Sequence, residues 1–122
     1  MKKNIVMLLL VLMLCGCGKQ KKECILNNEK DEDMKSYMRI TLTYNKEIVE
    51  TEELYAVYKF KTKEEATKNY STIEQIMEQD DSVKVEQVDE NIIAKGIKDV
   101  TNMQYDTEAK ISYYEQLGYT CE

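Results

Sequence analysis

The first seventeen residues have the pattern of a targeting segment rather than of a folded domain. We therefore expect only the residues after them to fold. Lys2 and Lys3 precede an uninterrupted apolar run from Ile5 to Leu14. A run of this length fits the apolar region of a signal peptide and is too short to span a bilayer stably. We therefore expect residues 1–16 to be removed, which leaves about a hundred residues, enough for one small domain.

The junction after this run, Leu14-Cys15-Gly16-Cys17, resembles the bacterial lipobox. The resemblance implies diacylglyceryl transfer to Cys17 and cleavage between Gly16 and Cys17. A cut before Cys15 is disfavoured, because Leu14 would stand where a small residue is required. The alternative is a plain secretory signal with incidental cysteines. Two acyl chains on one residue anchor a protein stably, so we expect Cys17 to hold the chain on the extracytoplasmic face of the cell membrane.

The residues after Cys17 divide into a tether and a single domain. Residues 17–23 comprise the lipidated cysteine and a polar stretch without periodicity, which we interpret as a tether. Its six residues after Cys17 reach at most about 20 Å. Residues 24–122 then form the domain, which must lie close to the membrane surface. Lys19, Lys21 and Lys22 could touch anionic headgroups, although such charges are more often simply solvated.

Two cysteines remain in the mature part, Cys24 and Cys121. Export favours a disulfide between them, and for so long a loop the chain-entropy gain is roughly 4 to 5 kcal/mol. A redox pair usually needs two close cysteines, as in a Cys-x-x-Cys motif, and the mature chain has none. We therefore predict a structural bridge that ties the start of the domain to its end.

The composition excludes several chemistries. The chain has no His, so it has no imidazole base, Ser-His pair or His metal ligand. Its four glycines cannot build a phosphate-cradling loop. The net charge is −6, and losing Lys2 and Lys3 leaves the mature part near −8. Such a chain repels nucleic acid and anionic headgroups unless its charge is locally segregated, so we expect no nucleic-acid partner.

The apolar pattern predicts an α+β domain of two layers. Alternation over residues 38–44 and 48–60 indicates a hairpin with an irregularity near residues 50–53. Thr62 and Glu65 form a capping box for a helix to about Gln79, with Ala66, Tyr70, Ile73, Ile76 and Met77 on its apolar face.

Residues 82–88 and 92–100 predict a second hairpin, in which Gly96 marks a bulge. A second helix, capped at Asp106 or Thr107, turns Ile111, Tyr114 and Leu117 inward and ends at Gly118. The predicted order is ββαββα, with short strands possible at residues 23–27 and 119–121.

Two stretches carry a family resemblance. The ending Leu117-Gly118-Tyr119-Thr120-Cys121 resembles that of small Firmicutes lipoproteins without an assigned mechanism. Thr41-Leu42-Thr43-Tyr44, followed by Lys63-Glu64-Glu65-Ala66, resembles the YehR-like (DUF1307) lipoproteins. The resemblance implies the α+β layout and supports pairing Cys24 with Cys121. It implies no activity.

The sequence carries only weak signals for metal binding, catalysis or ligand stacking. Residues 27–33 supply oxygen ligands for Ca²⁺ but lack the spacing of an EF-hand loop, so a solvated acidic turn is favoured. Glu52-Glu53 and Asp80-Asp81 offer carboxylates for glycoside hydrolysis. Tyr37, Tyr55, Tyr113 and Tyr114 are candidates for a stacking surface for sugars or peptides. We predict no catalytic residue, no metal site and no cofactor.

The leading hypothesis is a non-enzymatic lipoprotein that binds an envelope protein or a wall or membrane component. The alternatives are a carboxylate-based hydrolase of envelope glycans and a metal-ion-binding accessory protein. The sequence does not indicate the ligand.

The anchor and the bridge can be tested together by one mass measurement. Native protein from the membrane fraction, alkylated without reductant, is expected to show cleavage before Cys17, an added diacylglyceryl group and no alkylated thiol. Two alkylated thiols on a lipidated chain would refute the disulfide. A chain without lipid would refute the anchor.

Overall fold

The computed structural model describes residues 19–122. The predicted signal peptide (residues 1–16) and the lipidation site Cys17 lie outside the described residues. Within 19–122, no helix is long and apolar enough to cross a membrane.

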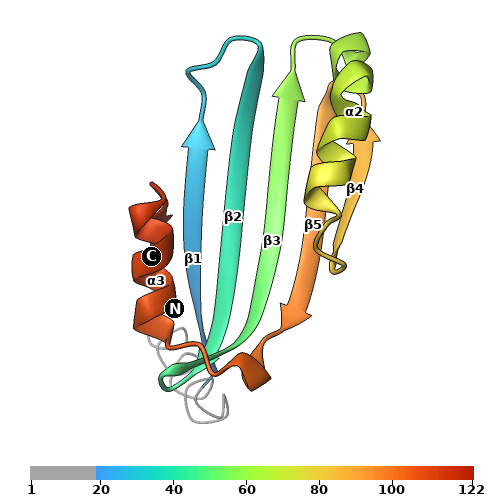
Figure 1. Cartoon of the computed structure of the whole chain (residues 1–122). Coiled ribbons are helices and arrows are strands. Elements are labelled where there is room, and N and C mark those ends of the chain that lie inside the picture. Colours follow the sequence, from blue (N-terminus) through green and yellow to red (C-terminus); the bar gives the residue numbers. More distant parts are fainter. Residues whose placement is uncertain (1–18) are drawn as a thin grey trace, which may run out of the picture.

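The domain is one antiparallel sheet of six strands with two helices (Figure 1). Three strands come first, β1 (Lys19–Asn28), β2 (Met34–Asn45) and β3 (Ile48–Phe60). The helix α2 (Lys63–Met77) leads to β4 (Val83–Val88) and β5 (Asn91–Asp99). A 3-10 turn, η1 (Thr101–Met103), leads to α3 (Thr107–Gln116) and β6 (Thr120–Cys121). The strand order across the sheet is β4-β5-β3-β2-β1-β6.

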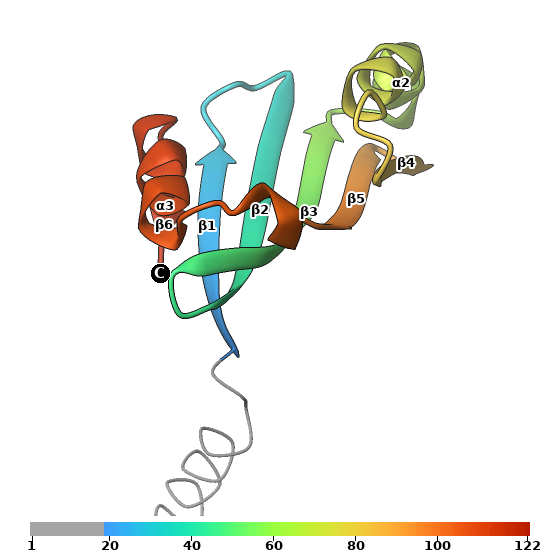
Figure 2. The ribbon, with the colours of Figure 1, turned by 60° about the horizontal axis from the view of Figure 1, so that its bottom comes forward.

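Both helices cover the same face of the sheet, one at each side (Figures 1 and 2). Under α2, Ala56, Phe60 and Ile92 belong to a first apolar cluster with Ala66 of the helix. Beside α3, Leu42 and Val49 belong to a second cluster with Cys24. Side chains of a strand alternate between faces, and the buried residues of β3 at positions 56 and 60 share one parity. The residues buried beneath the helices therefore share one face of the sheet.

The α+β content of the prediction is confirmed, but the order ββαββα is wrong. The observed order is βββαββαβ. Lys19–Glu23, expected to be the tether, form the first half of β1 and pair with β2 from Thr41 to Asn45. A polar strand carries no apolar alternation, so the sequence pattern could not reveal it. Pairing with β2, whose Thr41 and Leu42 are buried, provides the hydrogen bonds of this segment.

The hairpin of β2 and β3 confirms the predicted irregularity. Thr43 pairs with Thr51 and Tyr44 with Val49, so Glu50 is the extra residue of a β-bulge. The bulge turns the Glu50 carbonyl toward η1, where it accepts a hydrogen bond from the backbone N–H of Val100 at 2.8 Å. It thereby ties the strand to the segment that leads into α3.

Gly96 does not mark a bulge, contrary to the prediction. The register of β5 against both neighbours is continuous through it. A Cβ on Gly96 would stand 2.6 Å from the backbone oxygen of Ser82, so the glycine permits the close approach of the chain entering β4.

The predicted helix termini are largely confirmed. Thr62 caps α2 by accepting a hydrogen bond from the Glu65 backbone N–H, and Asp106 caps α3 in the same way through Ala109. Gly118 follows α3 with a φ of 102°, a conformation that favours glycine. Two inward assignments are wrong, because Ile76 is 59% exposed and Leu117 is 54% exposed.

The outer edge of β4 is covered by side chains of α2. The backbone N–H of Val85 donates to the Glu78 carboxylate at 3.1 Å, and the Tyr70 hydroxyl donates to the Val85 carbonyl at 3.0 Å. Glu78 lies at the end of α2, where its charge opposes the helix dipole. Its bond to Val85 offsets that effect and blocks an edge that could otherwise pair with another chain.

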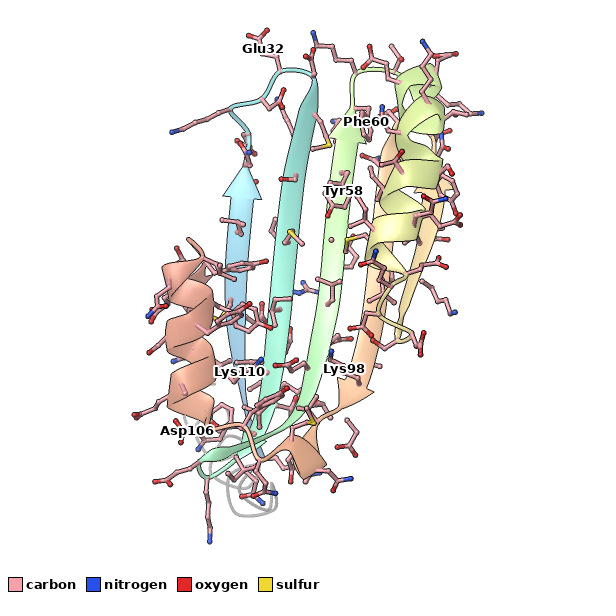
Figure 3. The ribbon with its side chains drawn as sticks, viewed as in Figure 1. Glu32, Tyr58, Phe60, Lys98, Asp106 and Lys110 are labelled. Atoms are coloured by element: carbon pink, nitrogen blue, oxygen red, sulfur yellow. A yellow bond between two sulfur atoms is a disulfide. The ribbon has the colours of Figure 1, made fainter. Side chains whose placement is uncertain are left out.

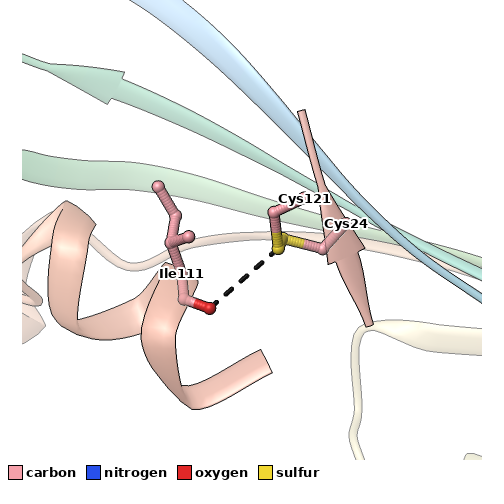
Figure 4. Close-up of a disulfide and its surroundings, with 3 residues drawn as sticks. All are labelled: Cys24, Ile111 and Cys121. Atoms are coloured by element: carbon pink, nitrogen blue, oxygen red, sulfur yellow. Dashed lines mark hydrogen bonds between the residues drawn. A yellow bond between two sulfur atoms is a disulfide. The ribbon is translucent and has the colours of Figure 1, made fainter. Parts of the chain in front are cut away.

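At the opposite edge of the sheet, a disulfide joins the short strand β6 to β1. Cys24 of β1 and Cys121 of β6 are directly paired residues, and their sulfur atoms are bonded at 2.03 Å (Figure 4). Cys24 is fully buried, and the Cys121 sulfur lies 4.0 Å from the Ile111 carbonyl of α3. Two backbone hydrogen bonds between Glu23 and Glu122 flank the bridge. The structure thus joins the two cysteines that the sequence paired.

Removing the bridge is expected to destabilise the domain strongly. The double variant Cys24→Ala/Cys121→Ala of the mature chain should lose about 4 kcal/mol of unfolding free energy, because the bridge closes a loop across almost the whole domain. Urea unfolding measures this loss. Wild-type protein in reductant is the control and should lose a similar amount. A loss below about 1 kcal/mol would show that the bridge contributes little more than an average side chain.

Candidate functional site

A groove lies on the helix-bearing face between α3 and the sheet. It has a volume of about 440 Å³, and a second hollow of about 130 Å³ shares Glu52, Lys98 and Tyr114 with it. Lys110 of α3 and Lys98 of β5 are labelled in Figure 3. The groove is lined by charged and aromatic groups, namely Glu52, Lys98, Tyr105, Lys110, Tyr113 and Tyr114.

Lys110 is the centre of the groove. Its Nζ lies 4.4 Å from the ring centroid of Tyr105 and 5.5 and 5.4 Å from those of Tyr113 and Tyr114. The faces of aromatic rings attract cations at such distances. The same Nζ is 2.8 Å from Oε1 of Glu52. The ammonium group is therefore held by three rings and one carboxylate.

The ion pair of Glu52 and Lys110 is largely withdrawn from solvent. The two side chains are 10% and 19% exposed, respectively. Oε1 of Glu52 is buried and accepts no hydrogen bond of good geometry. Charge therefore holds this pair, and removing Lys110 would leave a carboxylate without a counterion in a poorly solvated place.

A second ion pair borders the groove. Nζ of Lys98 lies 2.9 Å from Oδ2 of Asp80. The other oxygen of Asp80 accepts hydrogen bonds from the hydroxyl and the backbone N–H of Ser82. Hydrogen bonds from Lys98 and Ser82 lower the pKa of Asp80 to about 2, and the bond to Asp80 raises the pKa of Lys98. Asp80 is therefore ionised at neutral pH.

Two buried tyrosines beside the groove, Tyr114 and Tyr119, stay protonated phenols. Burial is the main cause that raises the pKa of Tyr114 well above its usual range, and the nearby charge of Glu52 adds to it. Burial likewise raises the pKa of Tyr119. The rings of Tyr113, Tyr114 and Tyr119 form two edge-to-face contacts, each with centroids 5.3 Å apart. Tyr114 and Tyr119 are therefore packing groups rather than bases.

The structure brings some of the sequence candidates together and separates others. Glu52, Asp80, Tyr113 and Tyr114 meet at the groove and its adjoining hollow. Tyr37 and Tyr55 instead contact each other on β2 and β3. They lie on the helix-free face, because on the registers beyond the bulge they alternate with the buried Ala56 and Phe60 of β3.

The acidic segment of residues 27–33 forms a turn. One oxygen of Asp31 accepts from the backbone N–H of Asp33, the Asn28 side chain accepts from that of Lys30, and Asp33 pairs with Lys61. Among residues 19–122, no three His, Cys, Asp or Glu side chains are grouped as metal ligands.

The sequence interpretation missed the lysines of the site. Lys110 lies three and four residues before Tyr113 and Tyr114, which is the spacing of neighbours on one helix face, and this signal was available. Lys98 and Tyr105 join the groove only through the pairing of β5 with β3 and the course of the segment around η1.

Comparisons with known proteins return no match. No family model, no curated protein and no solved structure matches this chain. The resemblance to the YehR-like lipoproteins therefore stays a prediction.

The pair of Asp80 and Lys98 can be tested by titration. Carboxyl NMR shifts should show Asp80 titrating at about pH 2, and Lys98→Met should move the pKa upward, toward the usual value of about 3.9. Because the native pKa is depressed, the pair stabilises the fold above the unfolded-state pKa. That stability is lost as the pH falls toward the native value.

Lys84→Met is the matched control, since Lys84 is an exposed lysine on β4 away from Asp80. It should leave the Asp80 titration unchanged. A wild-type Asp80 that titrates at its ordinary pKa would contradict the ion pair.

Proposed function

We propose that this chain is the precursor of a lipoprotein, anchored through Cys17 on the extracytoplasmic face of the membrane, whose domain binds an envelope ligand without transforming it. The observation that supports binding is the groove beside α3, where large apolar side chains stay exposed while the ionisable groups are paired. The anchor is supported by the sequence pattern of residues 2–17.

Two side chains at the rim of the groove are available to a ligand. Tyr113 is 52% exposed and Leu117 is 54% exposed, and both line the groove. Binding sites typically combine apolar or aromatic walls with a few fixed polar groups. Lys110 and Glu52 supply such groups at the centre of the groove. A peptide or saccharide segment, with both apolar edges and polar groups, fits this lining.

The state of the carboxylates favours binding over hydrolysis. A glycosidase needs one carboxyl group with a raised pKa to protonate the leaving oxygen. The pKa of Asp80 is lowered to about 2, so this group has no proton to give at neutral pH. Glu52 lies 2.8 Å from the Lys110 Nζ and is only 10% exposed, which favours a structural role for this side chain.

Photocrosslinking in intact cells tests the groove as the binding site. Benzoylphenylalanine in place of Tyr113 should capture a ligand of defined mass on the lipidated protein. Ile76 is the matched control position, because it is 59% exposed and lies on α2 rather than at the groove. Capture at 113 should exceed capture at 76 by about tenfold, as expected for a site that binds by at least 1.4 kcal/mol over background.

Two results would contradict the proposal. Equal adducts at both positions, or none at either, would remove the groove as the binding site. Saturable turnover of wall fragments or peptides by the purified protein would replace binding by catalysis.

A further inference from the structure

The helix-free face of the sheet concentrates positive charge. By the strand registers it carries seven cations, Lys19, Lys21, Lys35, Arg39, Lys59, Lys84 and Lys95, of which Lys19 is paired with Glu50. The acids on the same face are four, Glu23, Glu53, Glu86 and Asp99. The whole chain has a net charge of −6. The charge is thus segregated, because this face is positive while the rest of the molecule is strongly negative.

Lysines on this face stand directly opposite one another. Lys84 pairs with Lys95 across β4 and β5, and Lys35 pairs with Lys59 across β2 and β3. Like charges in directly opposed positions destabilise a sheet. A partner that brings negative charge to this face would remove both repulsions.

Apolar side chains flank the central cations of this face. Ile97, opposite Glu53 on β3, is 60% exposed, and the opposed pair of Ile93 and Val57 is partly exposed. The row of Lys84, Lys95 and Arg39 lies between them. The Arg39 guanidinium lies over the Tyr55 ring at 5.0 Å, so the cation covers part of an aromatic surface. A row of cations flanked by apolar side chains fits the boundary between lipid headgroups and acyl chains.

The position of this face relative to the anchor favours a bilayer as its partner. β1 begins at Lys19, so only Gly18 separates it from Cys17. Two residues reach about 7 Å, so an acylated Cys17 would hold the start of the sheet at the headgroups. Tethering at this distance turns a weak surface attraction into an intramolecular one.

We propose that the helix-free face of the sheet lies on an anionic bilayer surface. The lysines and Arg39 then meet lipid phosphates, and Ile97 enters the headgroup boundary. This orientation turns α2, α3 and the groove away from the membrane, toward ligands of the envelope. The inference rests on the proposed lipid anchor and adds the orientation of the anchored domain.

The absence of tryptophan from the chain permits a direct test. Ile97→Trp places one reporter on the helix-free face, and Ile76→Trp places a matched one on α2, since the two isoleucines are 60% and 59% exposed. Each lipidated protein is reconstituted in vesicles of phosphatidylglycerol with a brominated phosphatidylcholine. Emission of the reporter on the helix-free face should shift to the blue. It should also be quenched roughly twofold more than that of the reporter on α2, and 1 M salt, with a Debye length of about 3 Å, should reduce the difference.

Charge reversal distinguishes this face from general attraction. Lys84→Glu/Lys95→Glu should abolish the extra quenching of the reporter on the helix-free face. Lys63→Glu/Lys68→Glu, the same charge change on exposed positions of α2, should leave it intact. Equal quenching of both reporters would overturn the orientation. An equal blue shift of the Ile97→Trp protein in vesicles of zwitterionic lipid without phosphatidylglycerol would also overturn it. A concentration-dependent shift in detergent would also overturn it, because a second copy would then cover the face.

These results separate the two proposals. If the Ile97→Trp protein stays bound to the vesicles but its emission is neither shifted to the blue nor quenched, the orientation is refuted and the proposed anchor is retained. A native chain whose mass lacks a diacylglyceryl group would refute the anchor itself.

Discussion

The disulfide between Cys24 and Cys121 is the constraint on which the candidate site depends. α3 has only ten residues, too few for a helix that is stable by itself in water. Its start is held by the backbone bond from Thr107 to the Glu47 carbonyl, and its end by β6 and the bridge to β1. The groove is the space between this helix and the sheet. The bridge therefore fixes the position of Lys110 and the tyrosines as well as stabilising the fold.

The second organising feature is a sheet with one buried face. The two helices cover separate sides of the apolar face (Figures 1 and 3), and the groove has lining residues from α3, β3 and β5. At one edge of the sheet, the side chains of Tyr70 and Glu78 bond the backbone of Val85 in β4, and at the other the disulfide joins β1 to β6. Side chains bonded to an edge strand hinder its pairing with another chain. The two faces of the sheet carry different chemistry.

The ionisable groups of the groove are arranged in pairs rather than left free. Lys110 with Glu52 and Lys98 with Asp80 each place a strand residue against a residue distant in sequence. Each ion pair holds its two groups in fixed positions, which suits a site that presents fixed charges to a ligand. The proposed functions of the two faces are compatible, since a domain lying on its helix-free face would leave the groove accessible.

Much of the local structure was predictable from the sequence. The hairpin of β2 and β3, the bulge near Glu50, the cap at Thr62 and the left-handed Gly118 depend on apolar alternation and on capping or turn chemistry within a few residues. The same local rules failed for Ile76 and Leu117, because an apolar residue on a helix is not always covered. They failed for Lys19–Glu23 as well, since a polar segment becomes a strand only through pairing with β2.

The sequence by itself determined the apolar face of the sheet, the approximate helix boundaries and the presence of just two cysteines within residues 19–122. The tertiary structure alone decided that Glu52, Asp80, Lys98 and Lys110 meet at the groove and its adjoining hollow, and that seven cations share the opposite face. The physical reason is the order of the strands. Local propensities set each element, but which elements become neighbours follows from long-range pairing, here of β3 with β5 and of β1 with β6.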